Sequence, residues 1–182
     1  SIACMPNTKP ATDSPEAIDY VLEKAGAACG VRVLPIGAVT VGQKGEQLTD
    51  FEALKGAGAV ALSDDGVPVQ NANLMRDALI LAHRQGLTIL SHCEDADMVK
   101  NYAVNEGRVS RQLRLNGRPA IAEEIMVARD AMLAEETGAA VHICHISTAK
   151  SVALVRRYKR KGVQITCETC PQYLALDDGV YY

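Results

Sequence analysis

The sequence is poor in aromatic residues: it has no tryptophan and one phenylalanine, and aromatics make up 4% of its 182 residues. Proteins that bind single-stranded nucleic acid stack bases on aromatic side chains, and this chain offers few such platforms. The formal net charge is −3, with acidic and basic residues interspersed rather than gathered into a basic patch. We therefore expect no nucleic-acid partner.

Long hydrophobic runs are also missing. No apolar run approaches the roughly 18 residues of a membrane span, although hydrophobic residues make up 48% of the chain. We expect a substantial core and no membrane partner. No secretory signal is recognisable, so we expect reduced thiols and a cytoplasmic protein. The cysteines concerned are Cys4, Cys29, Cys93, Cys144, Cys167 and Cys170.

Short apolar runs alternate with amphipathic segments along the chain. This alternation predicts parallel strands covered by helices, in either a doubly wound sheet or a β/α barrel. Residues with functional chemistry end several strands, which favours a barrel formed by one domain over residues 1–182. The expected strands are 1–5, 31–40, 59–63, 87–91, 139–144 and 163–168. The expected helices begin after Ser14 and cover 49–55, 73–85, 119–137 and 148–161. Residues 105–117 form a polar stretch, and we interpret its arginines and Arg118 as a solvated face.

Candidate metal ligands follow three of these strands. His92 and His145 each end an apolar run, and Asp64 and Asp65 end a third. The carboxyl ends of barrel strands converge at one mouth, where two imidazoles and a carboxylate would suit zinc. Local sequence alone leaves two alternatives open: each histidine can be a satisfied core residue, and Asp-Asp-Gly can be only a turn.

The remaining candidates are weaker. Because side chains alternate along a strand, His142 should face away from His145 and toward the helices. Asn7 ends the first strand, where its amide either caps a turn or holds a substrate carboxylate. Cys167 and Cys170 have redox or zinc-knuckle spacing, but they are a single pair followed by Pro171, which does not favour such a role.

Six segments together resemble bacterial dihydroorotases of the amidohydrolase superfamily. They are CMPNTKP at 4–10, LSDDG at 62–66, LSHCED at 90–95, RPAIAEE at 118–124, HICHIS at 142–147 and ETCPQY at 168–173. The resemblance implies a (β/α)₈ TIM barrel with zinc at its mouth. The implied reaction is the reversible cyclisation of N-carbamoyl-L-aspartate to L-dihydroorotate in pyrimidine synthesis.

The resemblance also implies roles for individual residues. His92 and His145 match the metal histidines of the family. Asp65 matches the metal-bridging aspartate of the active site, where other branches of the superfamily use a carboxylated lysine. Asn7 matches the asparagine that binds the substrate carboxylate.

The sequence departs from the family at both ends. Nothing matches the His-x-His-x-Arg motif of the first strand or the Asp-x-Ala-x-His motif of the eighth. We therefore interpret the chain as an internal piece covering strands two to seven, inactive alone and holding at most one weak metal. Two alternatives remain: another cyclic amidohydrolase (hydantoinase, dihydropyrimidinase or allantoinase), or a metal-free structural partner of aspartate transcarbamoylase. The sequence leaves open whether the protein is a homodimer or associates with that transcarbamoylase.

Overall fold

Six short parallel strands form one sheet in the computed structural model, which describes residues 1–28 and 30–181. The sheet order is β1-β2-β3-β4-β7-β8. Every strand pairs in parallel with its neighbour, so the predicted parallel sheet is confirmed. The strands are β1 (Ile2–Cys4), β2 (Val33–Ala38), β3 (Ala61–Ser63), β4 (Ile89–Ser91), β7 (Val141–Ile143) and β8 (Ile165–Cys167).

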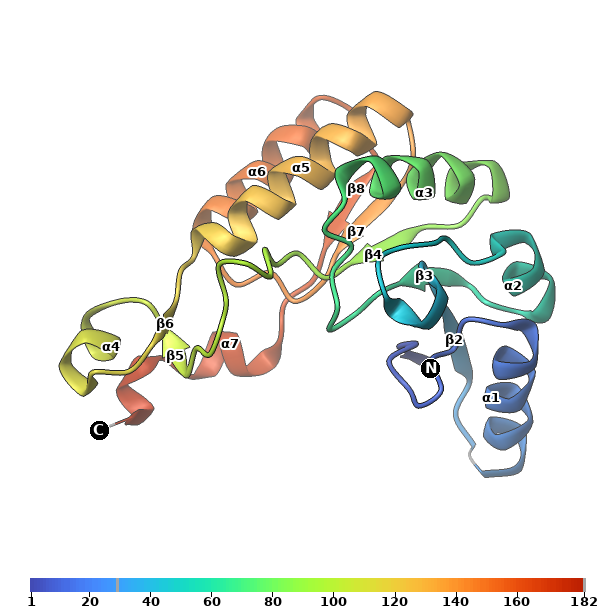
Figure 1. Cartoon of the computed structure of the whole chain (residues 1–182), viewed down its shortest axis with the longest axis horizontal. Helices are drawn as coiled ribbons and strands as arrows, with labels where there is room; N and C mark the ends of the chain where they lie inside the picture. The colour runs from blue at the N-terminus through green and yellow to red at the C-terminus, as the bar shows by residue number, and fades with distance from the viewer. Residues whose placement is uncertain (29, 182) are drawn as a thin grey trace.

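Helices cover one face of this sheet, as Figure 1 shows. They pack in chain order, each against the next: α1 (Pro15–Ala28), α2 (Phe51–Ala57), α3 (Ala72–Gln85), α5 (Ile121–Thr137) and α6 (Ala149–Arg160). Side-chain caps and glycines set their ends. The Asn71 side chain accepts the N–H groups of Asn73 and Leu74 at the start of α3, which ends at Gly86 in the left-handed region. These five helices and the six-stranded sheet are together called the arc below.

The hydrophobic core lies between the helices and the sheet. Strand residues Ile89, Val141, Ile143 and Ile165 belong to the same buried cluster as Leu79, Val127 and Val155 of the helices. The residues between them in the strands face the opposite, inner side of the sheet. On that side His142 pairs in register with Leu90 and Thr166.

The prediction that His142 faces the helices is therefore wrong. Val141 and Ile143 occupy the helix side of β7. Nδ1 of His142 lies 2.7 Å from the hydroxyl of Thr166, on the inner face. Side chains do alternate along β7. The prediction, however, counted the alternation from His145, where the backbone is not a regular strand.

Residues 104–118 form a small separate unit, called the lobe below. It consists of β5 (Val104–Asn105), α4 (Arg108–Leu113) and β6 (Gly117–Arg118), with β5 and β6 paired in parallel. Figure 1 places the lobe beside α7 (Pro171–Ala175) and the chain end, away from the helical layer. Two short 3-10 turns complete the fold: η1 (Val41–Gln43) and η2 (Asp178–Tyr181). The sequence indicates only a polar stretch over residues 105–117, and the lobe was not predicted.

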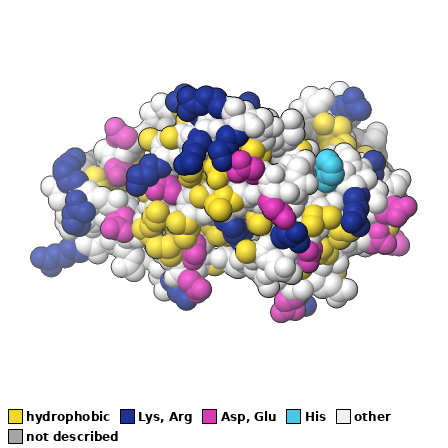
Figure 2. Space-filling model, turned by 90° about the horizontal axis from the view of Figure 1, so that it is seen from above, with side chains coloured by type: hydrophobic (Ala, Val, Ile, Leu, Met, Phe, Trp, Pro, Cys, Tyr) yellow, Lys and Arg dark blue, Asp and Glu magenta, His cyan; other side chains and the backbone are white. Residues whose placement is uncertain are grey.

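The surface seen in Figure 2 mixes basic, acidic and hydrophobic side chains. Ion pairs join neighbouring helices: Arg76 of α3 pairs with Glu136 of α5 at 2.9 Å. None of the helices within residues 1–28 and 30–181 has the length and apolar character needed to cross a lipid bilayer. The five described cysteines are free thiols, as expected, while Cys29 lies outside the described residues.

Candidate metal centre

Asp65, His92 and His145 meet at the carboxyl ends of β3, β4 and β7. Nδ1 of His92 lies 2.9 Å from Nε2 of His145. The Asp65 Oδ1 atom lies 3.5 Å from the first of these nitrogens and 3.3 Å from the second. The structure thus brings together all three residues proposed as metal ligands, with one donor atom of each facing the other two.

Different backbone geometry delivers each histidine. His92 continues the alternation of β4: the hydroxyl of Ser91 turns to the helix side and donates to Asp130 at 2.6 Å, so His92 takes the inner side. At His145 the backbone has a φ of 36°. Regular alternation after Ile143 would direct this side chain toward the helices; the left-handed turn directs it to the mouth instead. Non-glycine residues rarely adopt such a conformation, and it concentrates at functional sites.

Glu123 of α5 stabilises the loop after His145. Its carboxylate accepts the backbone N–H groups of Ser147 at 3.1 Å and Thr148 at 3.2 Å. Glu123 is almost fully buried, so these charge-assisted hydrogen bonds are shielded from water. The loop that follows the strained residue is therefore anchored to a helix of the core.

The adjacent aspartates Asp64 and Asp65 have opposite surroundings. Asp64 is 4% exposed and accepts hydrogen bonds from the N–H of Val39 at 2.8 Å, the N–H of Thr40 at 3.2 Å and the Thr40 hydroxyl at 2.5 Å. Burial raises the pKa of Asp64 to about 6, against the effect of these hydrogen bonds. Asp64 thus joins the loops after β2 and β3, and Asp65 is the carboxylate at the mouth.

The charge of Asp65 is stabilised at the mouth. Hydrogen bonds from His145 and then His92 hold the pKa of its carboxyl well below the usual range. The hydrogen bond between His145 and Asp65 also raises the pKa of His145. Asn7 follows β1 and donates from Nδ2 to Oδ2 of Asp65 at 3.0 Å, so its amide also reaches the mouth. Its role in substrate binding stays a prediction.

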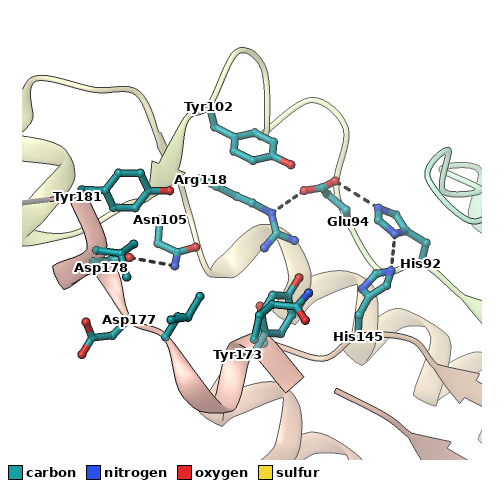
Figure 3. A pocket seen from close by; sticks show the side chains of 14 residues that line it. His92, Glu94, Tyr102, Asn105, Arg118, His145, Tyr173, Asp177, Asp178 and Tyr181 are labelled. Carbon is teal, nitrogen blue, oxygen red and sulfur yellow. Dashed lines mark hydrogen bonds and ion pairs between the residues drawn. The ribbon is translucent and has the colours of Figure 1, made fainter. Parts of the chain in front are cut away.

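Glu94 contacts the ring nitrogen of His92 that points away from His145, and Arg118 pairs with Glu94, as Figure 3 shows. Oε2 of Glu94 lies 3.3 Å from Nε2 of His92, and its other oxygen lies 2.5 Å from Nε of Arg118. A carboxylate on the second nitrogen of a ligating histidine fixes the tautomer and orientation of the ring. Because the Arg118 side chain is only 19% exposed and paired, the prediction that it belongs to a solvated face is wrong. Its place in RPAIAEE, a segment of the family resemblance, was the available signal.

A cavity of about 480 Å³ opens beside the two histidines. Its volume lies within the range of small-molecule sites. The lobe and the C-terminal segment form its far wall, where Nδ2 of Asn105 lies 3.4 Å from Oδ1 of Asp178. Burial raises the pKa of Tyr173 in the lining. Tyr102, Asn105 and Tyr173 were not predicted as pocket residues, because the contact between the lobe and the C-terminal segment joins residues that are distant in the chain.

The mouth residues fit a zinc ion. Zinc binds imidazole nitrogen and carboxylate oxygen at ~2.0–2.2 Å, so a tetrahedral ion holds its donor atoms roughly 3.4 Å apart. The donor atoms of Asp65, His92 and His145 are separated by 2.9 to 3.5 Å. Three protein ligands with one open position are the usual set of a catalytic zinc.

The arc has the fold of part of a TIM barrel. An L-hydantoinase (dihydropyrimidinase) from Arthrobacter aurescens matches with a TM-score of 0.80 at 19% sequence identity, covering 98% of this chain and 41% of that chain. A dihydropyrimidinase from Brevibacillus agri matches with a TM-score of 0.71 at 20% identity, covering 98% and 40%. At these identities the likeness concerns the fold alone, and it confirms the predicted incomplete (β/α)₈ barrel.

Sequence comparison gives closer relatives. The dihydroorotase of Ruminiclostridium cellulolyticum is 52% identical over 179 residues, covering 98% of this chain and 42% of that protein. The dihydroorotase of Acetivibrio thermocellus is 49% identical over 178 residues, with the same coverage. The chain thus spans less than half the length of the curated relatives it matches. A family model described as dihydro-orotase-like matches residues 1–151. The chain therefore belongs to the dihydro-orotase-like family.

Proposed function

We propose that the protein containing this chain is a dihydroorotase. It would catalyse the reversible, zinc-dependent cyclisation of N-carbamoyl-L-aspartate to L-dihydroorotate. One observation carries the proposal: Oδ1 of Asp65, Nδ1 of His92 and Nε2 of His145 converge within 3.5 Å, in a chain about half identical to dihydroorotases. Because the chain spans 42% of those relatives, the proposal concerns the complete protein and not this chain alone.

Asp65, His92 and His145 would hold the zinc ion. When bound, zinc polarises the ring amide carbonyl and promotes ionisation of the attacking water. The nitrogen and oxygen donors of these three residues suit zinc among the common metals of hydrolases. Glu94 would keep the His92 ring oriented, because it contacts Nε2 of His92, whereas Nδ1 would hold the ion.

The chain's own residues would also position the substrate. The amide of Asn7 has a second N–H besides the one donated to Asp65, and that N–H is suited to a substrate carboxylate. Holding reactants in place in this way can supply several kcal/mol of the barrier reduction, up to about 7–11. The cavity beside the histidines is the proposed space for this small-molecule substrate.

Three observations favour this proposal over the alternatives. The dihydroorotase relatives are 49% and 52% identical, whereas the solved hydantoinase and dihydropyrimidinase are 19% and 20% identical. At the position of the carboxylated lysine expected in those enzymes, this chain has Asp65. A metal-free partner of aspartate transcarbamoylase would not need His92 and His145, and both are retained. We also propose a cytoplasmic location, which the free cysteines support.

The proposal is tested with the intact protein that contains this chain. Purified protein loaded with zinc is assayed for ring opening of L-dihydroorotate, hydantoin, dihydrouracil and allantoin. We expect turnover of L-dihydroorotate alone, and formation of the same ring from carbamoyl aspartate. Turnover of one of the other rings in its place would identify another cyclic amidohydrolase. Absence of both zinc and turnover would favour the metal-free role.

A further inference from the structure

A buried carboxylate of the helical layer contacts the chain on both sides of His92. Asp130 of α5 is fully buried. Its Oδ2 atom accepts a hydrogen bond from the Ser91 hydroxyl at 2.6 Å and one from the Cys93 thiol at 3.5 Å. Ser91 and Cys93 are the residues directly before and after His92. One carboxylate oxygen therefore holds both chain neighbours of a proposed zinc ligand.

These two hydrogen bonds fix the direction of the His92 side chain. Because side chains alternate along an extended chain, Ser91 and Cys93 face the helices and His92 faces the mouth. A rotation of this segment that moved the imidazole would pull the hydroxyl and the thiol away from Asp130. It would leave a buried carboxylate short of hydrogen bonds, which is unfavourable in a site closed to water.

Arg129, the residue before Asp130, extends the contact to the segment after His92. Its guanidinium donates from Nε to Oδ1 of Asp130 at 2.8 Å. From Nη1 it donates to the backbone carbonyls of Val69 at 2.8 Å and Gln70 at 3.1 Å. The Gln70 side chain in turn donates to the carbonyl of Glu94 at 2.9 Å. The same two residues of α5 thus reach both the start and the continuation of the segment that carries His92.

A gain in stability does not account for this charged pair. The buried residues next to Asp130 along α5 are apolar: Val127, Ala131 and Ala134. Buried ion pairs usually gain little over apolar side chains of similar size, because the loss of hydration offsets the attraction between the charges. The contacts of Asp130 with Ser91 and Cys93 give the pair a different role.

We propose that Asp130 is a positioning residue for His92, with Arg129 holding the Asp130 carboxylate in place. Asp130 keeps Ser91 and Cys93 on the helix side of the sheet, and so keeps Nδ1 of His92 directed at the other donor atoms of the mouth. Zinc affinity then depends on a side chain that does not touch the ion. This inference rests on the zinc site of the proposed function, but not on the identity of the substrate.

The zinc affinity of the intact, metal-free protein tests the proposal, measured by competition with a chelating dye. We expect Asp130→Ala to weaken zinc binding by about 10–100-fold, the usual effect of losing a residue that orients a ligand. Asp130→Asn should retain most of the affinity, because either end of an amide can form a hydrogen bond with the Ser91 hydroxyl. His92→Ala removes the ligand itself and should bind zinc more weakly than Asp130→Ala.

Ser91→Ala covers the case in which Asp130→Ala does not fold. It removes a single hydroxyl and should weaken zinc binding by about 10-fold, the lower end of the same range. Thr49→Val is the matched control, since the buried Thr49 hydroxyl donates to the carbonyl of Ala38 at 2.7 Å, just before α2. Urea unfolding should show a loss of stability in both variants, whereas zinc affinity should fall only in Ser91→Ala.

Three results would overturn the proposal. They are an unchanged zinc affinity in folded Asp130→Ala or Ser91→Ala, an equal loss in Asp130→Asn and Asp130→Ala, or an equal loss in Thr49→Val and Ser91→Ala. Each compares a variant with a wild-type protein that binds zinc, so each leaves the proposed function standing. A wild-type protein that binds zinc but opens another ring would overturn the proposed function alone.

Discussion

The arc and the lobe contribute to the same pocket by different physical means. The arc holds Asp65, His92 and His145 at the ends of strands whose outer side chains form the hydrophobic core. The lobe has few buried apolar residues, among them Val104 and Val109, and a two-stranded pairing of two residues each. The ion pair of Arg118 with Glu94 links it to the group formed by Asp65, His92 and His145. We therefore expect the arc to determine whether metal binds and the lobe to adjust how tightly.

The largest effect should come from the arc. His145→Ala in the intact protein should remove zinc from the mouth and abolish turnover, because one of three converging ligands is lost. Zinc content after dialysis and dihydroorotate turnover are the measurements. His83→Ala is the control, since His83 is an exposed residue of α3, and both quantities should stay at the wild-type level. Retention of zinc at the mouth by His145→Ala would break the assignment.

Asp64→Ala should cause the next largest effect, on stability. It leaves the N–H and the hydroxyl of Thr40 without their buried acceptor, and the N–H of Val39 keeps only its 3.3 Å hydrogen bond to the carbonyl of Ser63. Each unsatisfied buried group costs about 1–3 kcal/mol, and entry of water reduces the sum, so we expect a loss of about 3 kcal/mol. Asp64→Asn keeps the shape and an acceptor oxygen and should cost less than about 1 kcal/mol. Urea unfolding measures both, and equal losses would contradict the proposed linking role of Asp64.

Glu94→Gln tests the link between the lobe and the metal group. Without the carboxylate, His92 loses the partner that orients its ring and Arg118 loses its ion pair. We expect zinc affinity at the mouth to fall by about 10–100-fold, the usual effect of losing such a partner. Glu136→Gln breaks an exposed Arg76 pair instead and serves as the control. If the two variants bind zinc equally, the lobe has no part in metal binding.

Gly117→Ala should have the smallest effect on global stability, and its local effect should be confined to the lobe. An added Cβ would lie 2.5 Å from the Cα of Glu106, so the backbone of the β5–β6 pair must shift. Hydrogen exchange should show faster exchange over residues 104–118 and unchanged protection in β4 and β7, because weakly packed units open independently of the core. Gly56→Ala, with open space at its Cβ, is the matched control in the arc. Equal loss of protection in both regions would show that lobe and arc unfold as one unit.

The sequence predicted the arc because its signals are local. The apolar runs that precede Asp65, His92 and His145 are each short, buried strands, and parallel strands deliver their ends to one edge. The true side of His142 was not predictable from periodicity alone, since the left-handed backbone at His145 breaks the alternation. Arg118 and the lobe were missed because their positions depend on contacts with Glu94 and with the C-terminal segment. A polar sequence does not encode such contacts in its pattern.

The central claim is that Asp65, His92 and His145 bind one metal ion together. Crystals of the intact protein grown with zinc, measured at the zinc absorption edge, test it most directly. We expect an anomalous peak within about 2.0–2.2 Å of Nδ1 of His92, Nε2 of His145 and a carboxylate oxygen of Asp65. Absence of a peak among these three atoms, with zinc found elsewhere in the protein, would contradict it.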